Sequence, residues 1–182
     1  PPQLSFQNDE MSQAEEGLKK MGMDPNDKYI CLYVRDEGYL LNSHTKNMSS
    51  NINDYKYIID RLVEEGYYVL RMGKKVKHEL DYVHPLVIDY GYKYQSDLMD
   101  LWLSAHCQFL INPVAGGLSS VAVAYRRPVF CFNYGLDFWS TAKDSLVSFK
   151  KFKKANQYLT FSEIIKLVKT LGEKGNKKEI MY

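Results

Sequence analysis

Five short, nearly continuous apolar runs constrain the fold of this 182-residue chain more than any other feature. They occupy residues 29–34, 67–70, 86–88, 108–111 and 129–132. A strand with one exposed face would carry polar residues at every second position, so unbroken runs are typical of strands that are buried on both faces. The runs therefore predict the strands of a parallel sheet.

Helical patterns lie between these runs. Tyr55, Ile58, Ile59, Leu62 and Val63 form one apolar stripe, and similar stripes cover residues 98–105, 118–125 and 164–171, with an earlier helix expected over 12–21. Ser96 or Asp97 is the expected cap of the second stripe. Alternation of strand and helix predicts an α/β fold, a Rossmann-like parallel sheet with helices on both faces, as a single domain over 1–182. Residues 135–157 show no readable pattern.

Charge and cysteine content narrow the class of protein. The net charge of +2 gives no argument for nucleic-acid binding. Four lysines form a local cluster at positions 150, 151, 153 and 154. This cluster is expected to be a solvated face, or to contact anionic lipid or an acidic acceptor. Cys31, Cys107 and Cys131 are odd in number and lack zinc-ligand spacing, so we expect free, buried thiols in a reducing compartment.

The sequence also lacks membrane and export signals. No apolar run approaches the roughly 18 residues of a membrane span. The first residues lack the basic and apolar regions of a signal peptide. These features predict a cytoplasmic protein.

Ligands of open parallel sheets bind outside the carboxyl ends of the strands. Arg35 and Arg71 follow the first two runs, and if those strands are neighbours, both guanidinium groups point into one crevice. Two planar guanidinium groups can each donate paired hydrogen bonds to the oxygens of a diphosphate. The open alternatives are a salt bridge from Arg35 to Asp36 or Glu37 and a sheet-edge cap by Arg71.

A glycine-containing turn joins the fourth run to the next helix. Gly116 and Gly117 would let the backbone approach a ligand, and Ser119 and Ser120 would add hydroxyl donors at a helix start that favours anions. The alternative is a tight turn with an ordinary helix cap.

Two further positions are candidates for donor recognition. Tyr90, in the loop after the third run, is expected to lie against a nucleobase, and Asp97 to hold a sugar or ribose hydroxyl. The alternative for Asp97 is stabilisation of its own helix dipole. Asp97 and Asp100 lie three residues apart and are not the Asp-x-Asp pair that bridges a metal to a diphosphate, so no metal is expected.

An ordered series of short motifs resembles a family of bacterial glycosyltransferases associated with surface-polysaccharide gene clusters. It runs from about Leu4 to about Ile165 and includes Cys31-Leu32-Tyr33-Val34-Arg35-Asp36, Val69-Leu70-Arg71-Met72-Gly73, Ile88-Asp89-Tyr90, Ser96-Asp97 with Asp100, and Leu159-Thr160-Phe161-Ser162-Glu163-Ile164. The layout is more distantly similar to the donor lobes of fucosyltransferases and heptosyltransferases. Where members carry a Thr/Ser-Ser-Gly turn, this chain has Val114-Ala115-Gly116-Gly117.

The resemblance implies the C-terminal donor-binding lobe of a two-lobed GT-B enzyme that needs no metal and no cofactor besides its nucleotide-sugar co-substrate. Arg35 would grip donor phosphate, the Gly116–Ser120 turn would hold phosphate or sugar, and the base would lie near Tyr90. The implied partners are a nucleotide-sugar donor, a glycan or lipid-linked acceptor and a missing N-terminal lobe. The lysine run adds a peripheral contact with the inner face of a membrane as an expectation.

Two other functions stay open from the sequence. One is a non-catalytic module that binds a nucleotide or anion. The other is an interaction domain without a ligand, which predicts that the polar residues at the strand ends pair among themselves.

Overall fold

The computed structural model describes residues 4–36, 38, 49–112, 116–134, 144–149 and 151–173. Within them, six strands form one sheet in the order β3-β2-β1-β4-β5-β6, and every pairing is parallel. The strands are β1 Tyr29–Tyr33, β2 Tyr68–Met72, β3 Val87–Ile88, β4 Leu110–Asn112, β5 Val129–Tyr134 and β6 Leu146–Phe149. The predicted Rossmann-like parallel sheet is confirmed, and each predicted run contains or overlaps a strand.

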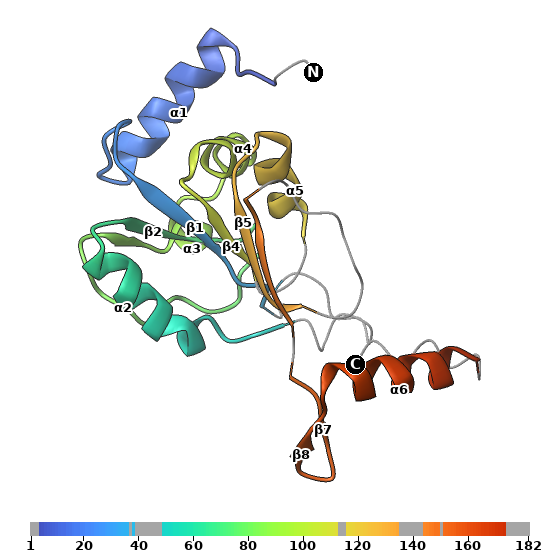
Figure 1. Ribbon diagram of the computed structural model, residues 1–182. Coiled ribbons are helices and arrows are strands. Elements are labelled where there is room, and N and C mark those ends of the chain that lie inside the picture. The colour runs from blue at the N-terminus through green and yellow to red at the C-terminus, as the bar shows by residue number, and fades with distance from the viewer. Residues whose placement is uncertain are drawn as a thin grey trace.

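Helices cover both faces of this sheet (Figure 1). The helices of the described residues are α1 Asn8–Lys20, the 3₁₀ turn η2 Ile52–Tyr55, α2 Lys56–Glu64, α3 Tyr90–Lys93, α4 Asp97–His106, α5 Gly117–Ala124 and α6 Phe161–Glu173. The last of these, α6, lies apart from the sheet (Figure 1). The Ser96 hydroxyl accepts a hydrogen bond from Met99 N at 3.3 Å, which confirms Ser96 as the cap of α4. The first helix begins earlier than predicted because the Glu10 carboxylate accepts from Gln7 N at 2.8 Å.

Alternate residues of β1 build the two halves of the core. Tyr29 and Cys31 point to the face covered by α1, α4 and α5, whereas Ile30 and Leu32 point to the face covered by η2 and α2. Successive side chains of a strand leave on opposite faces, so a strand between two helical layers must be apolar at every position. The continuous run at 29–34 has this cause.

The three cysteines are free and buried, as the sequence predicts. Cys31 lies against α4, where its thiol donates to the carbonyl of Leu103 at 3.5 Å. Burial raises the pKa of the Cys31 thiol well above its ordinary value, because a thiolate is poorly solvated in this interior. These cysteines therefore serve as small core residues.

The sequence predicted the last helix, α6, but not the strands after β5. All four residues of β6 are exposed, since this strand lies at the sheet edge and no helical layer imposes an apolar pattern on it. The strands β7 Lys153–Lys154 and β8 Gln157–Tyr158 form a separate antiparallel hairpin. β6 and β7 fall in the segment without a readable pattern, and β8 begins at its last residue.

Candidate functional site

The carboxyl ends of β1 and β4 define the topological switch point of the sheet. From β1 the chain builds β2 and β3 on one side, and it then returns to build β4, β5 and β6 on the other. The connections diverge between these two neighbouring strands, which leaves a crevice where open α/β sheets bind ligands. Arg35 follows β1 at this crevice, and Asn112 ends β4 there.

Gly116 brings the start of α5 against the end of β1. A Cβ placed on Gly116 would lie 2.8 Å from Cε1 of Tyr33, so the backbone reaches the tyrosine ring only because this residue lacks a side chain. Gly117, by contrast, faces open space. Sequence reasoning missed the contribution of Tyr33, although its position at the end of the first run was a signal.

The two serines of the turn have different surroundings. The Ser119 hydroxyl accepts from Gly116 N at 3.1 Å and donates to Gly116 O at 2.6 Å, so this side chain caps its own helix. Ser120 is exposed. The first-turn N–H groups of a helix lack intrahelical acceptors and favour an anion. This geometry combines the ordinary cap with an anion-favouring helix start; residues 113–115 lie outside the described part.

Arg35 is half-buried and stands where the loop after β1 begins. Its carbonyl accepts a hydrogen bond from Ser50 N at 2.9 Å, which closes that loop at its base. Residues 37 and 39–48 of the loop lie outside the described part of the chain. The structure thus places Arg35 beside the switch point, and its contact with a phosphate stays a prediction.

Arg71 lies within β2 rather than after it, and its side chain is 0% exposed. Its guanidinium donates to Asp89 Oδ1 at 2.9 Å and to Asp36 Oδ2 at 3.2 Å. The first two strands are neighbours, as expected, with Leu32 beside Arg71. The guanidinium points into the interior, however, so this arrangement offers it to two carboxylates and not to a phosphate in the crevice.

The same carboxylates also hold nearby loops. Asp36 accepts from Gly38 N at 2.8 Å and from Lys77 N at 2.7 Å, and Asp89 accepts from Leu80 N at 2.7 Å. Arg71 therefore ties together the segments after β1, after β2 and before β3. The polar residues Asp36, Arg71 and Asp89 at the strand ends thus pair with one another, as the interaction-domain alternative predicts. Sequence reasoning missed this triad.

Tyr90 is also interior, with 0% of its surface exposed. Its hydroxyl donates to Asp100 Oδ1 at 2.8 Å and accepts from Ser96 N at 3.1 Å. Burial raises the pKa of Tyr90 above its ordinary value. The ring packs into the core and offers no face to a nucleobase; in the same segment Tyr92 and Tyr94 are exposed by 51% and 41%.

The two acids of α4 have opposite environments. Asp97 is exposed and pairs with Lys74 at 2.7 Å, and that hydrogen bond lowers the pKa of Asp97. Asp100 is buried between Tyr90 and Gln95, and burial raises its pKa. Both acids lie on α4, whose Leu103 carbonyl accepts from the Cys31 thiol of β1, and a contact of Asp97 with a sugar hydroxyl stays a prediction.

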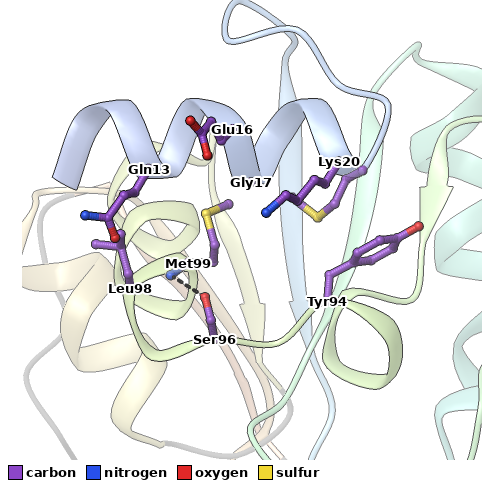
Figure 2. A pocket seen from close by; sticks show the side chains of 9 residues that line it. Gln13, Glu16, Gly17, Lys20, Tyr94, Ser96, Leu98 and Met99 are labelled. Atoms are coloured by element: carbon purple, nitrogen blue, oxygen red, sulfur yellow. Dashed lines mark hydrogen bonds between the residues drawn. The ribbon is translucent and has the colours of Figure 1, made fainter. Parts of the chain in front are cut away.

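A hollow of about 440 Å³ lies between α1 and the start of α4. Figure 2 shows its lining, with Gln13, Glu16, Gly17 and Lys20 on one wall and Tyr94, Ser96, Leu98 and Met99 on the other. Lys20 and Glu16 give it polar character and Met99 an apolar floor. None of the predicted site residues lines it, so it is separate from the switch point.

No cluster of three His, Cys, Asp or Glu side chains in the described part of the chain is arranged to hold a metal ion. No described helix has both the length and the apolar character needed to cross a bilayer.

Comparison with known proteins gives one informative likeness. No protein-family profile matches the sequence, and neither does any curated protein. The structure is similar to the crystal structure of a glycosyl transferase family 9 protein from Veillonella parvula DSM 2008, with a TM-score of 0.56 and 14% sequence identity. The likeness covers 94% of this chain and 46% of that protein, so the chain spans about half the length of its structural neighbour. At this identity the likeness establishes the fold.

Proposed function

We propose that this chain is the donor-binding lobe of a glycosyltransferase that moves a sugar from a nucleotide-sugar to an acceptor hydroxyl. The observation that carries the proposal is the close approach of Gly116, at the start of α5, to Tyr33, the last residue of β1 and two residues before Arg35. A cation and a helix N-terminus on adjacent strands suit a diphosphate. The fold likeness to a glycosyl transferase supports the same reading.

In the proposed reaction, the acceptor oxygen bonds to the anomeric carbon of the sugar, and the bond from that carbon to the diphosphate breaks. The proton of the acceptor hydroxyl passes to a general base of the second lobe. Negative charge grows on the departing diphosphate. Arg35 and the N–H groups near Gly117 stabilise this charge, which lowers the barrier because the interaction strengthens in the transition state. No metal or further cofactor takes part in this proposal.

Arg71 has a different role in the proposal. Because its guanidinium holds Asp36, the residue next to Arg35, it fixes the direction in which the chain leaves β1. We assign it as a positioning residue. Asp97 stays a candidate for a contact with the sugar, and the exposed rings of Tyr92 and Tyr94 are candidates for a contact with the base. The acceptor, a glycan or a lipid-linked glycan, and a second lobe would complete the enzyme on the cytoplasmic side of a membrane.

Calorimetric titration with UDP, GDP, CDP and ADP and their sugar conjugates tests the proposal. One nucleotide diphosphate should bind, and Arg35→Ala should weaken it about 10- to 100-fold, because a hydrogen bond to a charged group contributes about 1.5–3 kcal/mol. Arg61→Ala is the matched control, since Arg61 is exposed and pairs with Glu64 on α2. No binding by folded protein, or equal loss in both variants, would contradict it.

The pairing of Arg71 with Asp36 and Asp89 favours a second candidate, an interaction domain without a nucleotide. On this reading the strand-end polar groups serve only stability. Arg35→Ala would then change the melting temperature and leave every nucleotide titration flat. The same titrations therefore separate the two functions.

A further inference from the structure

Apolar and basic side chains gather on the exposed surface that follows β6. We call it the basic–aromatic surface and define it by Phe149 at the end of β6 together with Lys151, Lys153, Lys154, Tyr158 and Phe161. Tyr158 is 62% exposed, Phe161 53% and Phe149 39%. Large apolar side chains exposed together on a soluble domain commonly mark an interaction site.

The backbone holds this surface away from the sheet. β7 and β8 form a hairpin that extends from the end of β6 (Figure 1). The two turn residues, Ala155 and Asn156, have φ values of 45° and 66°. Positive φ at both positions is the type I′ geometry, whose twist matches that of a two-stranded ribbon. The lysines therefore lie on a defined hairpin.

Side-chain contacts place cations and rings next to one another. Lys153 stands opposite Tyr158 in the ladder, and its Nζ lies 4.6 Å from the centre of the tyrosine ring. Lys151 Nζ lies 5.9 Å from the same ring. Phe149 and Phe161 pair with their ring centres 6.0 Å apart. The hairpin and the aromatic pair thus form one mixed surface.

The charge of this segment has a single sign. Residues 149–161 include four lysines and four aromatic residues and no acidic residue. A lysine near an anionic bilayer strengthens binding about fivefold, and aromatic rings settle at the level of the lipid headgroups. A surface that combines both fits an anionic lipid bilayer better than it fits a polar ligand.

We propose that the basic–aromatic surface docks this protein on an anionic lipid bilayer. β6 is parallel to the other strands, so its last residue, Phe149, lies at the carboxyl edge of the sheet. The hairpin leaves from the same edge as the switch-point crevice. Docking through it would hold that crevice near the membrane, although the lipid contact does not depend on what the crevice binds.

Sedimentation of the purified protein with vesicles tests the proposal. Vesicles of equal parts phosphatidylcholine and phosphatidylglycerol should bind it, and vesicles of phosphatidylcholine alone should not. The double variant Lys153→Gln/Lys154→Gln should bind the anionic vesicles about 25-fold more weakly, a factor of five for each charge. The control Lys19→Gln/Lys20→Gln loses the same charge from α1, far from the hairpin, and should weaken binding about twofold or less because of screening.

A second variant tests the apolar part. Tyr158→Ser/Phe161→Ser changes two exposed rings, and circular dichroism should show an unchanged fold; its binding to anionic vesicles should fall about tenfold. Three results would overturn the proposal. These are no vesicle binding, equal loss in the two lysine variants, and a dimer in sedimentation equilibrium that the ring variant separates while vesicles bind neither form.

Discussion

Arg71 and Asp89 join the second and third strands through a buried ion pair of 2.9 Å, at a point where the chain turns into the loops around the candidate site. The side chain of Arg71 is 0% exposed and that of Asp89 5%. Two buried carboxylates depend on this one guanidinium, since Asp36 binds it from the other side. Arg71 thus links the residues that follow β1 and β3 at this edge of the sheet.

Replacing Arg71 by Met should destabilise the fold by about 3–5 kcal/mol, because it leaves two buried carboxylates without a counter-charge. Urea unfolding measures the loss. The control Lys56→Met breaks an exposed pair with Asp81 and should cost about 1 kcal/mol or less. Adding Asp36→Asn and Asp89→Asn to the Arg71 variant should restore part of the stability. An Arg71→Met protein within about 1 kcal/mol of wild type would contradict this role.

Gly116 and Gly117 should respond differently to alanine. Gly116→Ala places a methyl group 2.8 Å from the Tyr33 ring and should displace it, with a loss of about 1–3 kcal/mol and weaker nucleotide binding. Gly117→Ala enters open space at the start of α5 and should be neutral or stabilise the fold by up to about 1 kcal/mol. Thermal melts and titrations of both variants compare them, and the same response at both positions would refute the Tyr33 contact.

Tyr90→Phe should lower the free energy of unfolding by about 1–3 kcal/mol. The variant removes a hydroxyl that donates to Asp100 and accepts from Ser96 N, and it leaves these buried groups without their partner. Tyr92→Phe, on the same short helix, changes an exposed ring and should have no measurable effect. Urea melts that show equal stability for both variants would rule out this hydrogen-bonded arrangement.

Asp100 should make stability depend on pH in a direction opposite to that of a carboxylate in a salt bridge. Burial raises the pKa of Asp100 in the folded state above the value of about 3.9 in an unfolded chain. Between these two values the folded state keeps a proton that the unfolded state releases, so this contribution to stability falls as pH rises. Measured against Asp100→Asn, wild-type stability should decline across this window, and a flat or rising difference would disprove the shift.

The sequence by itself determined the strands β1 to β5 and the helices α1, α2, α4, α5 and α6. The continuous run at 29–34 is apolar because helices cover both sides of β1, and the stripe from Tyr55 to Val63 is apolar because one side of η2 and α2 packs on the sheet. Burial of one or both faces of an element produces an apolar periodicity within a short stretch of sequence, so it can be recognised without knowledge of tertiary contacts. Ser96 as the α4 cap and the three buried cysteines follow from the same local logic.

Only the tertiary structure decided what the polar residues do. Arg71 and Tyr90 follow or end apolar runs just as Arg35 does, yet both are interior, because residues distant in sequence supply their partners. The strand order placed β1 beside β4 and thereby brought Tyr33 against Gly116, which no spacing in the sequence indicates. The sequence did not predict β6, because all residues of this edge strand are exposed and no burial imposes an apolar pattern on them. Local periodicity records burial, whereas pairing depends on long-range contacts that a single sequence does not display.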